Sequence, residues 1–172
     1  MKIYLDCEGC VYNMLEAIKR RNPKFKPSGV KQYNFKDCDL GIERSEVLKY
    51  LGELKTFQSE PLYKGAQEGI RQLMRIGTVV GYTTVPESVV DYRKWQLKKL
   101  GITNMAIYTG DKPYMTDADV VIDDCPDILS MYDSSKTLKI MIAHPYNTMY
   151  MDAYSAKNLI EAVGTIRSVI GK

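Results

Sequence analysis

Five short apolar runs, rich in β-branched residues, recur along the chain at residues 3–5, 78–82, 105–108, 120–122 and 138–142. Stretches with the spacing of amphipathic helices separate most of these runs. A strand that is hydrophobic at nearly every position must be covered on both faces, which is typical of a parallel sheet. Because strands alternate with helices, the sequence predicts an α/β fold, with a parallel sheet of about five strands flanked by helices.

Three helical stretches are expected to cover this sheet. The first begins at Leu62. The second begins at Pro86, with Trp95 among its core-facing residues and Gly101 at the position of a C-terminal cap. Ser155 is expected to cap the last helix, because serine favours the position that precedes a helix.

Residues 12–61 differ in character from the rest of the chain. They contain helical stretches and turns, but no strand-like run as strong as those of the core. An insertion directly after the first strand would lie over the site that the strand ends form. We therefore predict a Rossmann-like core of residues 1–11 and 62–172, with a small helical cap of residues 12–61.

Composition restricts the class of protein. A chain of 172 residues, 45% of them hydrophobic, suffices for one good core plus an insertion. Its 24 Lys and Arg against 21 Asp and Glu fall well short of the excess of a dedicated nucleic-acid binder, so polymeric nucleic acid is not an expected partner. With four unevenly spaced cysteines and no apolar run of membrane-spanning length, we expect reduced thiols, no membrane partner and a cytoplasmic location.

Polar side chains follow four of the predicted strands, in segments 6–9, 82–84, 111–112 and 123–124. Ligands of doubly wound sheets bind beyond the carboxyl ends of the strands, so these segments are expected to converge. Acids, hydroxyls and a lysine at one sheet edge suit phosphoryl transfer. A hard divalent cation would offset the negative charge, a carboxylate could form an aspartyl-phosphate, and the lysine and hydroxyl could bind the phosphoryl oxygens.

In their order and approximate spacing, these segments resemble the four motifs of the haloacid dehalogenase superfamily. Residues 5–11, Leu-Asp-Cys-Glu-Gly-Cys-Val, are similar to its first motif, Asp-x-Asp-Gly-x-[Val/Thr]. Thr83 matches the second motif, Lys112 the third, and the Asp123-Asp124 pair the fourth. The implied fold is haloacid dehalogenase-like.

The resemblance is closest to the 5'(3')-deoxyribonucleotidases. Residues 82–85 resemble their Cys-Thr-Ser-Pro segment, and residues 109–127 resemble their Thr-x-Asp-Lys and Leu-Ile-Asp-Asp-Arg-Pro-Asp segments. Residues 145–147 match a Pro-Tyr-Asn near their C-terminus, and residues 57–66 resemble their cap-to-core junction. The similarity covers most of the core and matches the cap only loosely.

The resemblance implies a Mg²⁺-dependent phosphomonoesterase that hydrolyses (deoxy)ribonucleoside monophosphates to nucleoside and phosphate. Asp6 would be the nucleophile, forming the aspartyl-phosphate, and a Mg²⁺ ligand. Glu8 would be the general acid/base and would bind the metal through its backbone carbonyl. The remaining implied residues are Thr83 and Lys112 on the phosphate, and Asp123 and Asp124 at the metal.

Thr84, Tyr33 and Phe35 are the candidate substrate-binding residues. The two aromatic residues lie near positions where the related enzymes carry aromatics that stack on the base, and such stacking tolerates any base. Packing within the cap is the alternative role for both. The basic residues between 19 and 31 form either a solvated loop or a surface that attracts an anionic substrate.

Two departures from the family pattern leave alternatives open. Glu8 stands where the family carries Asp, and a displacement of about 1 Å can reduce a rate roughly a hundredfold. The chain could therefore be a nucleotide-binding module with weakened catalysis. The second departure is Cys125, which replaces an Arg of the relatives. Separately from these departures, the substrate of such a phosphatase could also be a sugar phosphate or a 3'-phosphorylated oligonucleotide. A homodimer is left open.

Each candidate also has a purely structural interpretation. Strand-end acids such as Asp6 can cap turns, and an isolated lysine such as Lys112 can be solvated. Cys7 and Cys10 form a C-x-x-C pair, but a zinc site is not expected, since His144 is the only histidine. We expect both thiols to pack as small apolar residues.

Overall fold

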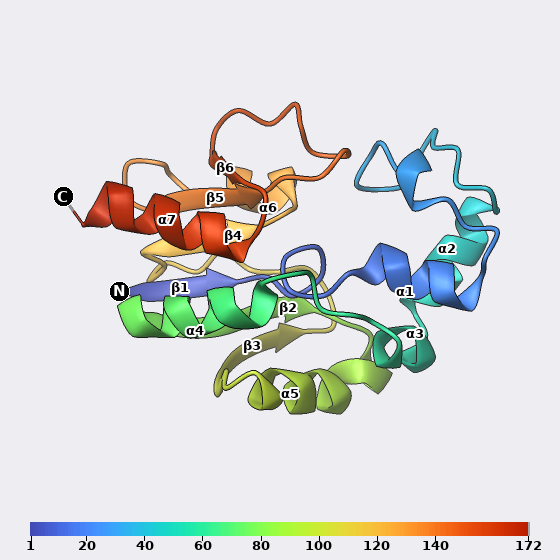
Figure 1. Ribbon diagram of the computed structural model, residues 1–172, viewed down its shortest axis with the longest axis horizontal. Coiled ribbons are helices and arrows are strands. Elements are labelled where there is room, and N and C mark those ends of the chain that lie inside the picture. The colour runs from blue at the N-terminus through green and yellow to red at the C-terminus, as the bar shows by residue number, and fades with distance from the viewer. Residues whose placement is uncertain (172) are drawn as a thin grey trace.

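The computed structural model describes residues 1–171. Within them, six strands form one sheet in the order β3-β2-β1-β4-β5-β6, and every neighbouring pair is parallel (Figure 1). The strands are β1 (Lys2–Leu5), β2 (Thr78–Thr84), β3 (Asn104–Tyr108), β4 (Val120–Asp123), β5 (Leu138–Ile142) and β6 (Tyr154–Ala156). The α/β fold predicted from the apolar runs is confirmed.

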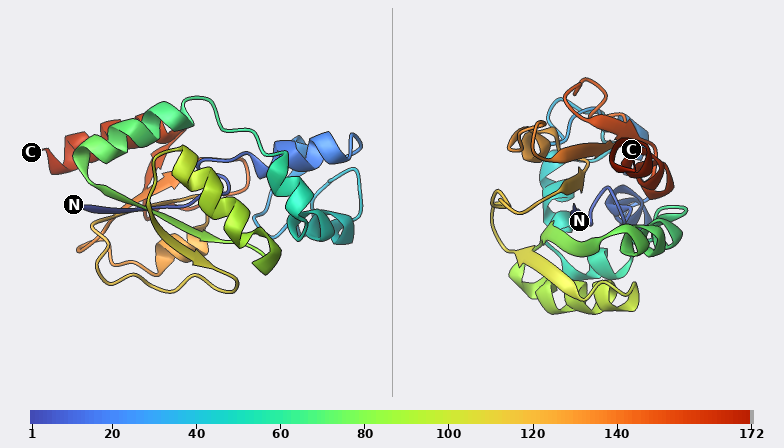
Figure 2. Two further views of the ribbon diagram at one scale, coloured as in Figure 1. Left: turned by 90° about the horizontal axis from the view of Figure 1, so that it is seen from below. Right: turned by 90° about the vertical axis from the view of Figure 1, so that its left-hand side faces the viewer.

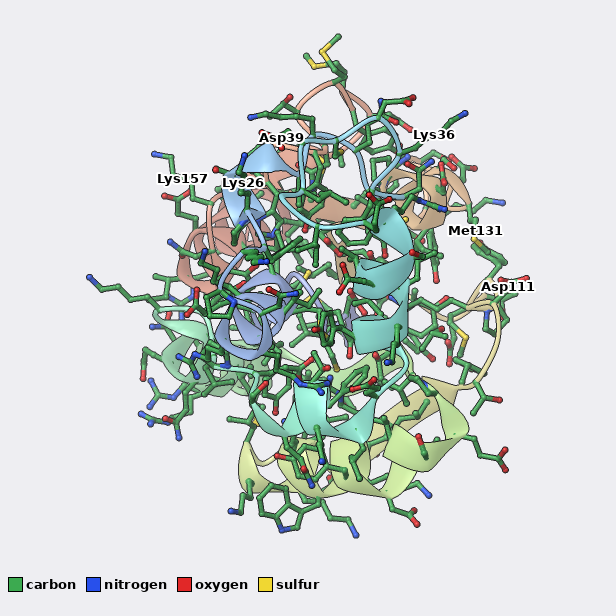
Figure 3. All side chains as sticks on the ribbon, turned by 90° about the vertical axis from the view of Figure 1, so that its right-hand side faces the viewer. Lys26, Lys36, Asp39, Asp111, Met131 and Lys157 are labelled. Carbon is green, nitrogen blue, oxygen red and sulfur yellow. The ribbon has the colours of Figure 1, made fainter. Side chains whose placement is uncertain are left out.

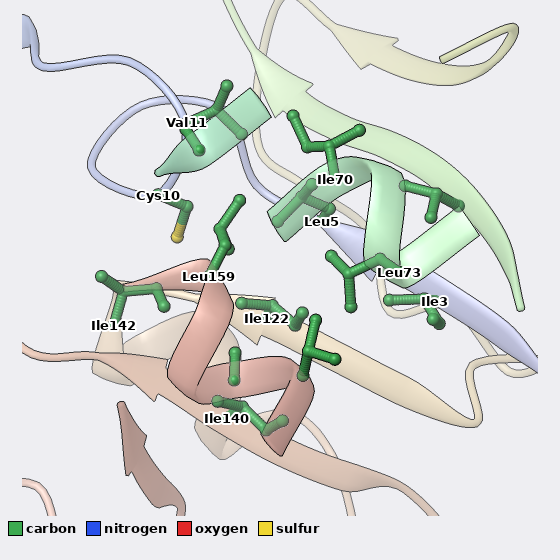
Figure 4. Packing of buried hydrophobic residues seen from close by; sticks show 14 of the residues in the cluster. Ile3, Leu5, Cys10, Val11, Ile70, Leu73, Ile122, Ile140, Ile142 and Leu159 are labelled. Atoms are coloured by element: carbon green, nitrogen blue, oxygen red, sulfur yellow. The ribbon is translucent and has the colours of Figure 1, made fainter. Parts of the chain in front are cut away.

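Helices α4 (Ala66–Ile76), α5 (Val90–Lys99) and α7 (Leu159–Ile170) contribute to the apolar cluster on one face of the sheet. Figure 4 shows Leu73 of α4 and Leu159 of α7 packed against the strand residues Ile3 and Ile122. Side chains alternate along a strand, so Tyr4 belongs to the other face, which α6 (Pro126–Ser130) covers. The two views of Figure 2 show these layers.

The segment between β1 and α4 lies beyond the carboxyl ends of the strands (Figure 1). It contains α1 (Met14–Arg21), the 3₁₀ turn η1 (Pro27–Gly29), α2 (Arg44–Leu51) and α3 (Leu54–Gln58). Its apolar side chains form a cluster of their own, which also takes in residues around η2 (Glu87–Val89) of the core. The chain enters this segment near Tyr12 and leaves it near Leu62, and an antiparallel bridge pairs these two residues.

The sheet has six strands where about five were predicted, because residues 154–156 also pair with β5. Two sequence-based details were wrong. Ser155 belongs to that strand, and the cap of α7 is Asn158, whose side chain accepts the backbone N–H groups of residues 160 and 161. Trp95, predicted to face the core, is instead 47% exposed, because the buried face of α5 carries Arg93, Gln96 and Leu97. The Trp95 ring stacks on the ring of Tyr92.

Within residues 1–171, no helix is both long enough and apolar enough to cross a lipid bilayer.

Candidate active site

Lys112 joins two acids at the carboxyl edge of the sheet. Its Nζ donates to Oδ1 of Asp6 at 2.6 Å and to Oδ2 of Asp123 at 2.9 Å. Asp6 directly follows β1 and Asp123 ends β4, so the neighbouring strands bring the two carboxylates together. All three side chains are almost completely buried, which strengthens their electrostatic interaction.

Negative charge is in excess at this edge. Burial raises the pKa of Asp6 well above its usual range, and Asp123 raises it further, while Lys112 acts in the opposite direction. Burial and the neighbouring Asp123 raise the pKa of Asp124 to about 7. One lysine therefore does not balance three buried carboxyl groups, and a bound cation would stabilise their ionised forms.

The two adjacent acids of the fourth motif differ in their free oxygens. Asp123 is fully engaged, since Oδ2 accepts from Lys112 and Oδ1 accepts the N–H of Cys125 at 2.9 Å. Asp124 accepts the Tyr146 hydroxyl on Oδ2 at 2.6 Å, but its buried Oδ1 has no hydrogen-bond partner among residues 1–171. Asp124 can therefore offer an oxygen to a further ligand.

The donor set fits a divalent cation. One potential ligand atom from each of Asp6, Cys10 and Asp124 lies within 4.8 Å of the others. The two carboxylates are hard oxygen ligands, which suit Mg²⁺, whereas the Cys10 sulfur suits softer metals. Burial raises the pKa of the Cys10 thiol well above its usual range, so the thiol stays protonated and the carboxylates are the better ligands.

Gly9 allows the loop after β1 to approach Asp124. Its φ is +78°, and a Cβ at this position would lie 2.2 Å from Oδ2 of Asp124. The loop is held from the other side by His144, whose Nε2 lies 2.7 Å from the Gly9 carbonyl oxygen. Asn147 donates to the carbonyl oxygen of Asp124 at 2.8 Å. The Pro-Tyr-Asn segment thus positions the acidic pair, a role that its sequence did not predict.

The substitution Gly9→Ala is expected to lower the free energy of unfolding by about 1–3 kcal/mol, because alanine is strained at positive φ and its methyl group would displace Asp124. Thermal melting measures this effect. Gly164→Ala is the matched control, since α7 leaves open space around Gly164 and alanine favours helix. Equal melting temperatures for Gly9→Ala and the native chain would contradict the close approach.

The Glu8 side chain does not face the acidic pair. Its Oε2 accepts from Oγ1 of Thr83 at 2.5 Å, and its Oε1 accepts from Nη2 of Arg93 at 2.5 Å. Thr83 is fully buried, and its hydroxyl group is engaged by Glu8.

Arg93 was missed by the sequence analysis. Its side chain is 0% exposed on the inner face of α5. A signal was present, because Arg93 lies four residues after Val89 and four before Leu97, and both of these apolar residues are buried. Helical periodicity therefore predicts that Arg93 lies on the buried face of its helix, together with these two apolar residues.

A cavity of about 270 Å³ opens over the acids. Its floor includes Asp6, Glu8, Lys112 and Asp124. Its remaining walls are largely apolar and aromatic, including Tyr33, Phe35, Phe57, Tyr63 and Tyr146. Thr84 also lines it, whereas Thr83 and Asp123 lie outside its lining. Most of the predicted site residues therefore line one cavity. The other two, Thr83 and Asp123, lie behind its lining and donate to or accept from residues that line it.

Comparison with known proteins gives a likeness in structure alone. No family model and no curated protein matches the sequence. A haloacid dehalogenase-like family hydrolase from Streptococcus pneumoniae is 14% identical, with a TM-score of 0.60 over 96% of this chain and 97% of its own. A haloacid dehalogenase-like family hydrolase from Xanthomonas campestris is 9% identical, with a TM-score of 0.56 over 98% of this chain and 95% of its own.

A haloacid dehalogenase-superfamily hydrolase from Ehrlichia chaffeensis is 14% identical, with a TM-score of 0.53 over 98% of this chain and 97% of its own. In each case the comparison covers nearly the whole of both chains. The chain therefore has the fold shared by haloacid dehalogenase-like hydrolases. The closer resemblance to deoxyribonucleotidases stays a prediction.

Proposed function

We propose that this protein is a Mg²⁺-dependent phosphomonoesterase that forms an aspartyl-phosphate on Asp6. The observation that carries the proposal is the buried convergence of Asp6, Lys112 and the Asp123-Asp124 pair at the strand ends. The fold shared with haloacid dehalogenase-like hydrolases supports it. A surplus of buried carboxylates destabilises a fold, so its presence at the floor of a cavity favours a chemical role.

Two side chains are the proposed direct ligands of Mg²⁺, namely Asp6 and Asp124, with the Glu8 backbone carbonyl as a third. Asp124 is assigned because its Oδ1 is buried without a partner among residues 1–171, whereas both oxygens of Asp123 are engaged. When bound, Mg²⁺ would offset the negative charge of phosphate and of the attacking carboxylate. Asp123 then orients Lys112 and the acidic loop.

The reaction proceeds in two displacements. An oxygen of Asp6 attacks phosphorus, the bond from phosphorus to the ester oxygen breaks, and Glu8 gives a proton to the departing oxygen. In the second step Glu8 takes a proton from water, the water oxygen attacks phosphorus, and the bond to Asp6 breaks. Lys112 is placed beside Asp6, where its charge stabilises the equatorial phosphoryl oxygens.

A nucleoside monophosphate is the proposed substrate. The cavity walls beyond the acids are largely aromatic and apolar, and Tyr33 and Phe35 bring two rings from the insertion. A base could stack on such rings, while a sugar phosphate would need polar groups for its hydroxyls. Phe35 has a φ of +60°, an uncommon conformation for an aromatic residue that turns up preferentially at ligand sites.

A 3'-phosphorylated oligonucleotide is less well supported. Within residues 1–171, Lys112 is the only cationic side chain that lines the cavity. Several charges of the basic stretch are paired with acids, since Arg20 bonds Glu16, Arg21 bonds Glu53, and Lys26 bonds Asp39 at 3.0 Å. Figure 3 shows Lys26 and Asp39 together at the surface of the insertion. Of residues 19–31, all of which the structure describes, only the apolar Val30 lines the cavity.

The test is phosphate release from a panel of ribo- and deoxyribonucleoside monophosphates, compared with sugar phosphates and glycerol phosphate. Nucleotides are expected to have the highest kcat/KM. Tyr33→Ala is expected to raise KM for nucleotides about tenfold, because one stacked base contributes roughly 1–3 kcal/mol. The same substitution is expected to leave glycerol phosphate turnover unchanged.

Tyr154→Ala serves as the matched control, since this tyrosine is exposed on β6 and does not line the cavity. Equal kcat/KM values for nucleotides and sugar phosphates would contradict the substrate class. An equal effect of Tyr33→Ala on all substrates would contradict the stacking role.

A further inference from the structure

Arg93 lies between two carboxylates in the interior. Its Nη2 donates to Oε1 of Glu8 at 2.5 Å and to Oε2 of Glu60 at 2.9 Å. The guanidinium carbon lies 4.4 Å from the centroid of the Tyr12 ring and 5.3 Å from that of Phe57. The side chains of Arg93 and Glu60 are both 0% exposed. The arginine is therefore held on both sides, and its charge is shared between two acids.

Such a buried ionic group is not required for stability. Removing the Arg93 guanidinium and the Glu60 carboxylate from water costs several kcal/mol per ion, and apolar residues of similar volume stabilise a core equally well. Two of the arginine nitrogens, Nε and Nη1, have no hydrogen-bond partner among residues 1–171, which adds to that cost. Of the two carboxylates that accept from Arg93, Glu8 lines the cavity and Glu60 does not.

The three residues come from separate parts of the fold. Glu8 belongs to the loop after β1, and Arg93 is on α5. Glu60 lies two residues before Leu62, in the connection that returns the chain from the insertion to the core. Arg93 thus links the carboxylate at the cavity to the point where insertion and core meet.

We propose that Arg93 is a positioning residue for Glu8, and that Glu60 holds Arg93 in place from the other side. The inference rests on the proposed function, in which Glu8 moves the proton of the departing oxygen. Glutamate has one more rotatable bond than aspartate, so its carboxylate needs more support to stay at one place. Arg93 donates to Oε1 and Thr83 donates to Oε2, so the carboxylate is held at both oxygens, and the proton would go to a lone pair that these two donors leave free.

The test compares two substrates in single turnovers, with release of the leaving group as the readout. A nucleoside 5'-monophosphate releases an alcohol and needs the proton, whereas p-nitrophenyl phosphate releases a stable phenolate without one. Arg93→Met is expected to slow the nucleotide about a hundredfold, the scale of a misplaced general acid, and to leave p-nitrophenyl phosphate within about threefold. KM for the nucleotide is expected to stay unchanged.

Three further variants extend the comparison. Arg93→Lys is expected to restore part of the nucleotide rate, because an ammonium still reaches a carboxylate. Glu8→Asp is expected to slow the nucleotide selectively, since the shorter side chain cannot contact both Thr83 and Arg93. Lys94→Met is the matched control, because Lys94 is an exposed cation on the same helix, and both rates are expected to stay unchanged.

Equal losses with both substrates for Arg93→Met would overturn the inference and make the arginine purely structural, as would a faster nucleotide reaction for Glu8→Asp. If Arg93→Met does not fold, Glu60→Gln decides, since it keeps the shape of the side chain and weakens the hold on Arg93. A smaller loss confined to the nucleotide supports the inference, and equal losses overturn it. Asp6→Asn separates the two proposals, because turnover by that variant would remove the aspartyl-phosphate chemistry itself.

Discussion

The variant Asp6→Asn is expected to turn over phosphate esters at least about a thousandfold more slowly than the native chain, because an amide cannot attack phosphorus as a carboxylate does. Its folded state is expected to be at least as stable as that of the native chain. The reason is the surplus of buried carboxyl groups at the sheet edge, where burial and Asp123 both raise the pKa of Asp6. Removal of one of these charges relieves repulsion in a buried site.

Phosphate release and thermal melting together check this result. The matched control is Asp91→Asn, which removes an exposed carboxylate from α5. The Asp91 side chain is 97% accessible to solvent. That variant is expected to retain native activity and melting temperature. An Asp6→Asn protein that hydrolyses nucleotides at the native rate would exclude the aspartyl-phosphate mechanism. A lower melting temperature for Asp6→Asn would instead contradict the charge surplus.

Removal of Mg²⁺ by a chelator is expected to abolish turnover and to make stability strongly dependent on pH. Burial and Asp123 raise the pKa of Asp124 to about 7 in the folded chain, whereas the pKa of an aspartate in the unfolded chain is about 4. A carboxyl group with a raised pKa favours folding below its unfolded pKa, and this contribution is lost as the pH rises through about 7. The chelated protein should therefore melt lower at pH 8 than at pH 5, by several degrees.

Added Mg²⁺ is expected to raise the melting temperature at pH 8 and to have little effect at pH 5, since protonated carboxyl groups bind metal poorly. Thermal melts with chelator and with Mg²⁺ at the two pH values measure this. Asp124→Asn is expected to lose the Mg²⁺-dependent shift at pH 8. Activity that survives chelation, or an unchanged shift in Asp124→Asn, would contradict the assignment of Asp124 as a ligand.

The two proposals explain why a glutamate can occupy the acid/base position. A longer side chain at Glu8 reaches away from the acidic pair, toward Thr83 and the buried Arg93. Thr83, expected from sequence to hold phosphate, donates to this glutamate in the structure. Thr84 and Lys112 both line the cavity. The Thr84 hydroxyl group donates to the Gly110 carbonyl oxygen at 2.9 Å, so Lys112 is the better-placed donor for a phosphate oxygen.

Much of this protein follows from local sequence. Apolar runs without alternation predict a parallel sheet, because only strands covered on both faces can be apolar throughout. Since parallel strands present their carboxyl ends at one edge, the positions of Asp6, Lys112 and Asp123 along the chain already predict that they meet. In the structure, Nζ of Lys112 lies 2.6 Å from Oδ1 of Asp6 and 2.9 Å from Oδ2 of Asp123. Chain order alone sufficed for that part of the site.

Tertiary packing decided the rest. Arg93 meets Glu8 across 85 residues, and only the rotation of α5 on the sheet turns this arginine inward and Trp95 outward. The free oxygen of Asp124 likewise depends on the Tyr146 hydroxyl group, 22 residues further along the chain. Such contacts depend on side-chain rotamers and helix rotation, which are set by the sum of many long-range packing interactions and leave no repeating pattern in the sequence.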